Sequence, residues 1–258
     1  MRPAHHASGR AATAPERSVV ADDAGPVRLA RMPSKLPPED PPSEIADAWL
    51  SADPLPPDPF PPLARWLSEA FEDGRQPAPH AVALATVDEA GDPTVRMVLV
   101  QRIEPEPGAL VFFTHYDSPK GRDLERLGRA ATAFHFGPLG RQARITGQVA
   151  RIAPDESDAY FASRPLDAQI GAWASRQSQP LEDRATLLAE MDRVADRFGA
   201  DLGTADPTEA EIPRPPGWGG FRLVADRVEL WHSRPGRIHD RAEWHRDGSS
   251  WRAARLYP

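Results

Sequence analysis

The sequence predicts a mainly β protein with some α structure, an antiparallel barrel with peripheral helices. Short apolar runs that fit strands recur between residues 81 and 256, separated by turn residues. Helical segments lie between them, but few are long enough for repeated βαβ crossovers. The chain contains no internal repeat. These three observations favour an α+β barrel over a doubly wound or solenoid fold.

The first part of the chain carries no strand signal. Residues 1–45 are rich in Ala, Pro, Arg and Asp without an apolar period, and we expect this extension to be disordered. A proline-dense spacer, 54–62, precedes an expected amphipathic helix over 62–73. We therefore expect one domain over 46–258, which includes an acidic surface loop at 199–211.

The expected elements then follow in order. Ala81–Val87 and Thr94–Gln101 form a hairpin, because Asp88–Pro93 contains a glycine between two apolar runs. Ser118 is expected to be the N-cap of a helix that has Pro119 at its first position. Two more helices are expected over 155–163 and 181–198. The remaining strands are expected at 109–114, 130–136, 141–152, 219–225, 227–232, 241–246 and 251–256.

Composition excludes several classes of function. The formal net charge of −7 argues against general nucleic-acid binding. No apolar run approaches the roughly 18 residues that span a bilayer, and no secretory signal is visible. Without cysteine there is no disulfide framework, so we expect a cytoplasmic protein. The histidines lack ligand spacing, and no glycine-rich nucleotide loop or nucleophile elbow occurs, so neither a metal site nor Rossmann or hydrolase chemistry is expected.

Cationic and amide side chains in strands and at helix starts are the first candidates for a binding site. Arg96 lies in an otherwise apolar strand, either at a solvated end or paired with an anion. Ser118–Lys120 could cradle a phosphate at a helix start or be an ordinary cap with a surface lysine. Gln142 could reach a ring edge or lie on the sheet surface. Tyr160 and Arg164, four apart on one helix face, could bind an anion or each other.

A second candidate follows Trp231. Arg237, His239 and Arg241 alternate, so in an extended strand they point to one side. Three such groups repel unless an anion neutralises them, and Asp240 would face the other way. The pattern predicts an anion site, with a solvated charged strand as the alternative.

Segments of the chain, in their order, resemble the pyridoxine/pyridoxamine 5′-phosphate oxidase family. They are Ser163-Arg164-Pro165 through Gln169-Ile170-Gly171-Ala172-Trp173 to Gln177-Ser178, Trp218-Gly219-Gly220-Phe221-Arg222, and Trp231 with Arg237-Ile238-His239-Asp240-Arg241. The resemblance covers about residues 55–258. It implies an FMN-binding split β-barrel homodimer with two FMN molecules at the subunit interface.

The resemblance also implies roles for individual residues. The implied FMN-binding residues are Arg96, Met97, Val98, Leu99, Gln101, Phe113, Thr114, Lys120, Gln142, Gln177, Ser178, Trp231 and Arg241. Lys120 and Arg96 would hold the FMN phosphate. The partner subunit would supply Gln177, Ser178, Trp231 and Arg241. The implied substrate-binding residues are Tyr160 and Arg164, at the substrate phosphate, and the catalytic pair Arg237 and His239.

The implied reaction oxidises pyridoxamine or pyridoxine 5′-phosphate to pyridoxal 5′-phosphate, with O2 as acceptor and H2O2 as product. Gln101, Pro119 and Ala168 stand where the family usually has a lysine, a basic residue and a serine. The family's N-terminal Arg-x-x-Tyr is not recognisable. Gln101 and the missing N-terminal motif favour an alternative, an oxidase of a dihydrophenazine-type intermediate in phenazine biosynthesis, whereas Tyr160, Arg164 and the intact Gln169–Trp173 segment favour the vitamin B6 substrates. A non-catalytic flavin-, haem- or F420-binding protein is the third possibility, although a pure carrier would not need Arg237 and His239.

Overall fold

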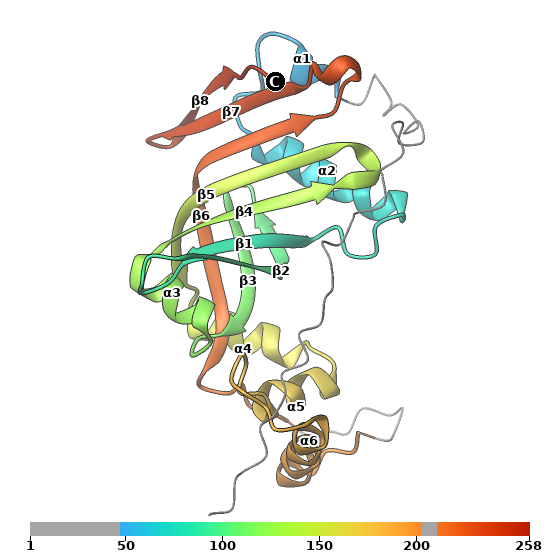
Figure 1. Ribbon diagram of the computed structural model, residues 1–258, viewed down its shortest axis with the longest axis vertical. Coiled ribbons are helices and arrows are strands. Elements are labelled where there is room, and N and C mark those ends of the chain that lie inside the picture. The colour runs from blue at the N-terminus through green and yellow to red at the C-terminus, as the bar shows by residue number, and fades with distance from the viewer. Residues whose placement is uncertain (1–46, 203–210) are drawn as a thin grey trace, which may run out of the picture. The chain divides into compact units, whose positions relative to one another are not determined.

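The computed structural model describes residues 47–202 and 211–258, which lie in one compact unit (Figure 1). The extension expected at 1–45 lies outside the described residues, as do residues 203–210 of the expected acidic loop. Within the two described stretches, no helix is long and apolar enough to cross a membrane.

Six antiparallel strands close into a barrel, which confirms the predicted fold class. They are β1 (Ala81–Val87), β2 (Pro93–Glu104), β3 (Ala109–His115), β4 (Arg129–Phe136), β5 (Arg141–Arg151) and β6 (Trp218–His232). The order is β3-β2-β1-β4-β5-β6, and the pairing of β3 with β6 closes the barrel. The turn signals predicted the β1–β2 hairpin correctly, since Asp88 N and Asp92 O are hydrogen-bonded at 3.0 Å.

Strand β6 belongs to two parts of the sheet. Its first half, from Trp218 to Val224, pairs with β3, and its second half, from Arg227 to His232, pairs with β7. Between the halves the register with β5 shifts by one residue, so Asp226 is the extra residue of a β-bulge. The sequence predicted two strands here. The structure has one strand with a bulge, because the backbone stays extended through the extra residue.

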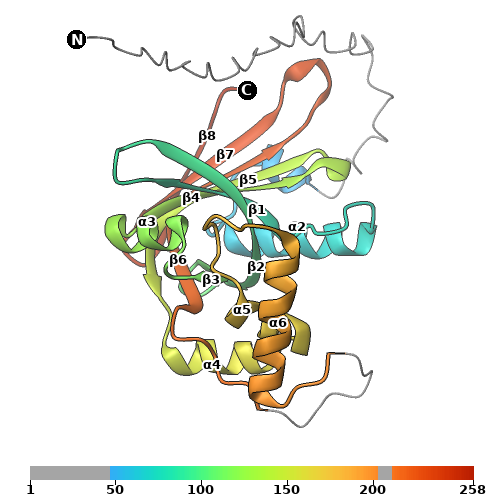
Figure 2. The same ribbon diagram turned by 60° about the horizontal axis from the view of Figure 1, so that its bottom comes forward.

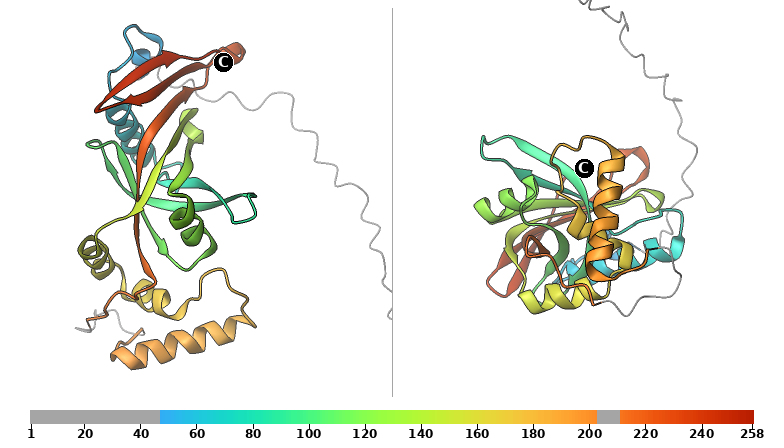
Figure 3. Two further views of the ribbon diagram at one scale, coloured as in Figure 1. Left: turned by 90° about the vertical axis from the view of Figure 1, so that its left-hand side faces the viewer. Right: turned by 90° about the horizontal axis from the view of Figure 1, so that it is seen from below.

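The last hairpin, β7 (Asp240–Asp247) and β8 (Ser250–Arg255), extends the sheet beyond β6. It lies at one end of the barrel, while helices α4 (Pro154–Ala162), α5 (Leu166–Ala174) and α6 (Arg184–Phe198) gather at the other (Figures 1 and 3). Because β6 runs from one end to the other, a single strand connects both regions.

The helices agree with the prediction in part. Helices α2 (Phe60–Asp73), α3 (Pro119–Leu127), α4 and α6 were expected, whereas α1 (Ala48–Ser51) and α5 were not. Short 3-10 turns occur at η1 (Gly137–Leu139) and η2 (Pro235–Arg237). Helix α6 starts later than expected, because the side chain of Asp183 caps it by accepting the Thr186 amide.

Two apolar cores hold these parts together. Helix α2 buries Phe60, Leu63 and Trp66 completely against the barrel interior. A separate cluster among α4, α5 and α6 centres on Phe161 and Ile170. Figure 2 shows how these three helices lie together. Burying each of these large side chains contributes about 1.5–3 kcal/mol. The second cluster therefore fixes the helices beside the barrel end, where a cavity opens.

Candidate active site

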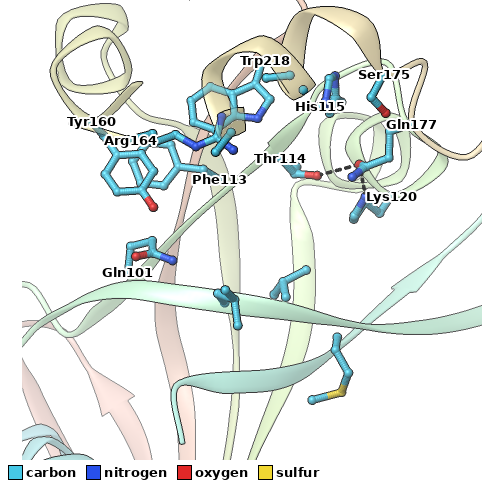
Figure 4. A pocket seen from close by; sticks show the side chains of 16 residues that line it. Gln101, Phe113, Thr114, His115, Lys120, Tyr160, Arg164, Ser175, Gln177 and Trp218 are labelled. Carbon is cyan, nitrogen blue, oxygen red and sulfur yellow. Dashed lines mark hydrogen bonds between the residues drawn. The ribbon is translucent and has the colours of Figure 1, made fainter. Parts of the chain in front are cut away.

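The first cavity, of about 440 Å³, lies where β2 and the end of β3 meet α3, α4 and α5 (Figure 4). We call it the barrel-end pocket. Its walls are Met97, Val98, Leu99, Gln101, Phe113, Thr114, His115, Lys120, Tyr160, Arg164, Ala168, Gly171, Ala172, Ser175, Gln177 and Trp218. Most of the predicted site residues before position 178 thus come together.

Lys120 marks one end of this pocket. Its Nζ donates to Gln177 Oε1 at 2.5 Å and to Ser118 Oγ at 3.2 Å, and Thr114 Oγ1 lies 3.1 Å from the same Gln177 oxygen (Figure 4). Burial, and then the positive charge of Arg96, lower the Lys120 pKa to about 8. Lys120 is therefore a desolvated ammonium that is mostly protonated at neutral pH. An anionic ligand would stabilise it.

The helix start explains how a lysine becomes buried here. Ser118 is the N-cap, and its Oγ accepts the Gly121 amide while donating to His115 O. A Cβ on Gly121 would lie 2.2 Å from Tyr116 O, so only glycine allows this close approach. The Ser118 hydroxyl is thus an ordinary N-cap. Lys120, however, is buried, whereas the alternative of an ordinary cap had expected it at the surface.

Arg96 does not line the pocket. Its guanidinium donates to Thr86 Oγ1 and Thr94 Oγ1, each at 2.7 Å, and to Leu84 O. It stands near Asp123, whose charge opposes the lowering of the Arg96 pKa by burial. Arg96 is thus a partly buried, hydrogen-bonded side chain, and its charge acts on Lys120 from beside the pocket.

Aromatic rings and a guanidinium form the other end of the pocket. The Tyr160 ring stacks on Phe113, with centroids 3.8 Å apart, and is nearly parallel to Trp218. Arg164 lies over Trp218, its Cζ 4.8 Å from the ring centroid. Arg164 Nη1 is buried without a hydrogen-bond partner among the described residues. Figure 4 places Gln101 on the hydroxyl side of Tyr160.

The two polar side chains at this end of the pocket, Tyr160 and Arg164, are hydrogen-bond donors. Burial lowers the pKa of the Arg164 guanidinium from its ordinary value and raises the pKa of the Tyr160 hydroxyl, which therefore keeps its proton. Arg164 lies beyond the end of α4, in the link to α5, so the expectation that Tyr160 and Arg164 share a helix face was wrong. The helix stops at Ala162, and both side chains reach the pocket by different routes.

Glycines allow Trp218 to reach this stack. A Cβ on Gly219 would lie 2.0 Å from the Tyr116 hydroxyl, and one on Gly220 would lie 2.4 Å from Ile152 Cδ1. The two glycines thus leave room for the Tyr116 ring and the Ile152 side chain against β6, next to Trp218, whose ring centroid lies 5.5 Å from that of Phe113. The Trp-Gly-Gly motif therefore has a packing role beside the pocket wall.

Sequence reasoning missed His115, which also lines the pocket. Burial lowers the pKa of His115, so the ring is neutral at pH 7. Its position next to Thr114, at the end of a strand, was the available signal. Among the residues that the structure describes, no carboxylate lines the barrel-end pocket. Lys120 and Arg164 thus give it a positive charge that its own walls do not neutralise.

A second, smaller cavity lies on the outer face of β5, β6 and β7. We call it the sheet-face pocket, and Gln142, Arg144, Glu229, Trp231 and Arg241 line it. Cross-strand register creates it, because Gln142 lies opposite Trp231, which lies opposite Arg241, and Arg144 lies opposite Glu229. Its volume is about 170 Å³, and it shares no lining residue with the barrel-end pocket.

His239 extends the sheet-face pocket. Its ring packs on Trp231 with centroids 4.6 Å apart at 43°. His239 Nδ1 lies 3.2 Å from the Arg234 amide nitrogen. Because an amide N–H only donates, Nδ1 accepts, and a neutral ring carries its proton on Nε2. The ring is thereby fixed as an Nε2–H donor.

Arg237, His239 and Arg241 do not share one strand face, so that expectation was wrong. Arg237 lies exposed in the turn η2 with a φ of 62°, and β7 begins only at Asp240. The sequence Pro235-Gly236 forces the turn. Asp240 does face elsewhere, onto Arg234 at 2.6 Å. Arg241 is neutralised by Glu229, at 2.7 Å, which sequence reasoning missed.

Three further placements differ from expectation. Gln177 was expected from a partner subunit, but it contacts Lys120 of its own chain, because the chain turns back after α5. Gln142 lies beside Trp231 and away from Lys120. Ser178, with a φ of 69°, lines a neighbouring cavity against α6 that shares Gln177 with the barrel-end pocket.

Comparison with known proteins identifies the family. Residues 67–198 match the family described as pyridoxamine 5′-phosphate oxidase. Residues 218–258 match the pyridoxine 5′-phosphate oxidase C-terminal dimerisation region. The chain belongs to the pyridoxine/pyridoxamine 5′-phosphate oxidase family. The resemblance found in the sequence is thus confirmed, and the chain belongs to a family of oxidases.

Named relatives agree. A pyridoxine/pyridoxamine 5′-phosphate oxidase of Rhodopseudomonas palustris is 48% identical over 203 residues, covering 78% of this chain and 90% of that protein. One of Burkholderia thailandensis is 44% identical over 214 residues, covering 82% and 94%. The sheet-face pocket residues from Glu229 to Arg241 lie in the segment that matches the family's dimerisation region.

Solved structures share the fold. PhzG from Burkholderia lata 383, in complex with tetrahydrophenazine-1-carboxylic acid, is 31% identical with a TM-score of 0.69, covering 87% of this chain and 98% of that one. A pyridoxamine 5′-phosphate oxidase-related, FMN-binding protein from Nostoc punctiforme has a TM-score of 0.60 at 17% identity, covering 78% and 97%. The latter likeness concerns the fold alone.

Proposed function

We propose that the protein is an FMN-dependent oxidase that converts pyridoxamine or pyridoxine 5′-phosphate to pyridoxal 5′-phosphate. The proposal rests on the barrel-end pocket. Lys120 is largely buried there, Arg164 is partly buried beside stacked aromatic rings, and none of the described lining residues is acidic. Such a pocket suits an anionic, aromatic ligand. The curated relatives bear the name of this activity.

The residues present fit FMN. Lys120, Thr114 and Gln177 form a compact polar group that would hold the phosphate. The exposed apolar residues of β2, Met97 and Leu99, would lie against the isoalloxazine. The chemistry that FMN supplies when bound is acceptance of two electrons as hydride and their transfer to O2, which leaves as H2O2.

A homodimer would complete the site. Val95, Met97 and Leu99 alternate along β2 with 70%, 61% and 46% of their surface exposed. An apolar stripe of this kind favours an interface. In a twofold dimer the sheet-face pocket of one subunit could close the barrel-end pocket of the other, and symmetry would make two equal sites. Trp231 and Arg241 would then contact the flavin from the partner subunit.

The substrate would lie between Arg164 and His239. Arg164 Nη1, which is buried without a described partner, and the protonated Tyr160 hydroxyl would bind the substrate anion. His239, whose Nδ1 accepts the Arg234 amide and whose Nε2–H can donate, and exposed Arg237 would orient the substrate ring. Alanine at either position should slow turnover and leave flavin binding unchanged; equal turnover would contradict these roles.

A second candidate is oxidation of a dihydrophenazine-type intermediate. Gln101 and Ala168 line the anion end without adding a positive charge, so Arg164 is the fixed cation there. A singly charged carboxylate would need less compensation than a doubly charged phosphate. The PhzG likeness, whose structure contains tetrahydrophenazine-1-carboxylic acid, supports the same alternative.

One set of assays tests these proposals. The purified protein should release FMN on denaturation and form peroxide with pyridoxine 5′-phosphate. Gln101→Lys should lower the KM for that substrate about tenfold if it is the true one. An unchanged KM, with faster peroxide release from a reduced phenazine carboxylate, would favour the second candidate. Bound flavin without peroxide from any donor would indicate a non-catalytic binder, and failure to take up FMN would refute the cofactor assignment.

A further inference from the structure

Glu229 lies at the centre of the sheet-face pocket and touches both of its arginines. Its Oε1 accepts from Arg241 Nε at 2.8 Å, and its Oε2 accepts from Arg144 Nη1 at 2.8 Å. Only 4% of its surface is exposed. A buried carboxylate with both oxygens engaged is a fixed point, because leaving either oxygen unpaired would carry a large desolvation cost.

Arg241 is held from a second side as well. Its Nη1 donates to Tyr257 O at 2.9 Å, and its own carbonyl accepts the Leu256 amide at 3.0 Å. A guanidinium has five N–H donors in a rigid plane. Glu229 contacts Nε and Nη2, and Tyr257 O accepts from Nη1, so the guanidinium plane of Arg241 is fixed in the wall of the sheet-face pocket.

The fold alone does not account for this carboxylate. Glu229 lies directly opposite Glu243 across β6 and β7, and like charges in that register are destabilising. Glu243 has its own partners, Arg227 and His245. Glu229 depends on Arg144 and Arg241, which line the pocket. A neutral side chain would remove the repulsion, so the acidic group serves the pocket more than the sheet.

We infer that Glu229 is a positioning residue for the cofactor, because it orients Arg241 and cancels part of the pocket's positive charge. The sheet-face pocket then recognises the uncharged ring edge of the flavin, and the phosphate binds in the barrel-end pocket. This rests on the proposed FMN site. Two arginines without Glu229 would form a second anion site, which would compete for the phosphate. With Glu229 the pocket keeps a net charge of about one.

The test is a double-mutant cycle on FMN affinity, measured by quenching of flavin fluorescence with the full chain. Glu229→Gln keeps the size of the side chain and removes its charge, and it should weaken FMN binding about tenfold. In an Arg241→Ala background the same substitution should have no further effect, because the residue that Glu229 orients is gone. Glu229→Asp, which keeps the charge, should recover part of the affinity.

Glu243→Gln is the matched control. It removes a carboxylate of similar burial, 6% exposed, from the neighbouring position without touching Arg241, and should leave FMN affinity unchanged. Inorganic phosphate provides a readout besides flavin: it should compete with FMN more strongly in Glu229→Gln than in the parent protein. Additive effects in the cycle, or equal losses in both glutamine variants, would overturn the inference. A parent protein that binds no FMN would refute the proposed function instead.

Discussion

The two pockets differ in how their positive charges are balanced. In the barrel-end pocket, Lys120 and Arg164 face a cavity without a described acidic wall. In the sheet-face pocket, Arg144 and Arg241 already share the buried carboxylate of Glu229. The positive charge of the first pocket favours an anionic ligand, whereas the donors of the second are held in place and favour a neutral hydrogen-bond acceptor. Under the proposed function, this difference assigns the phosphate to the barrel-end pocket and the flavin ring to the sheet-face pocket.

The largest test of this difference compares FMN with riboflavin, which lacks the phosphate. Lys120→Ala should weaken FMN binding about ten- to a hundredfold, since a charged hydrogen bond contributes about 1.5–3 kcal/mol. Riboflavin affinity should not change. Arg122→Ala is the control, because Arg122 is an exposed cation of the same helix that binds Asp117 O. If both ligands lose affinity equally, Lys120 does not hold the phosphate.

A change of pH should alter ligand binding through the barrel-end pocket only. Because the Lys120 pKa is about 8, FMN affinity should fall roughly tenfold per pH unit above that value. FMN-free protein should show the opposite trend. The unfolded chain binds the lysine proton up to its ordinary pKa of 10.5, so stability should rise with pH between about 8 and 10.5. Lys120→Met carries no titratable amine, so it should show neither the pH dependence of FMN affinity nor that of stability. Fluorescence titrations and melting curves measure the two.

Trp231 should affect both ligands alike. Trp231→Ala removes the ring that supports His239, and stacking of this kind contributes about 0.5–1.5 kcal/mol. FMN and riboflavin should therefore both bind up to about tenfold more weakly, as measured by fluorescence titration. Trp231→Phe, which keeps a ring, should lie near the parent protein. A loss of affinity for FMN but not for riboflavin would indicate that the phosphate binds in the sheet-face pocket.

The smallest expected effect separates substrate from cofactor within the barrel-end pocket. Tyr160→Phe keeps the stack with Phe113 and Trp218 but removes the hydroxyl. The KM for pyridoxine 5′-phosphate should rise about fivefold, from the loss of one hydrogen bond of about 1 kcal/mol, with FMN affinity unchanged. A change in FMN affinity without a change in KM would mean that Tyr160 lies at the FMN end of the pocket and not at the substrate end.

Local patterns predicted the elements whose cause is local. The Asp88–Asp92 turn and the Ser118 cap each depend on a few consecutive residues, and both are present. Helix α5 was missed because Ile170, Ala172 and Ala174 are spaced by two, the period of a strand, although all three are buried in a helix. The bulge at Asp226 was missed because it depends on pairing with β5.

The same distinction holds for the site. The motifs identified most residues of the barrel-end pocket and three of the sheet-face pocket, Gln142, Trp231 and Arg241, because the family resemblance carries them in order. They could not show that Glu229 neutralises Arg144, since these residues are 85 positions apart and meet only through the pairing of β5 with β6. Nor could they show that Gln177 reaches Lys120 of its own chain, which depends on how α5 ends.

The extra residue in β6 has a consequence for both pockets. Side chains alternate between the two faces of a strand, so Glu229 and Trp231 look outward while Val228 and Leu230 fill the interior. The bulge takes Asp226 out of that alternation, because Ala225 and Arg227 pair with consecutive residues of β5, Gly147 and Thr146. A strand that carried Asp226 without a bulge would slip by one position, which would turn the acid and the indole into the barrel and two aliphatic side chains outward. The bulge thereby keeps Glu229 and Trp231 on the outer face.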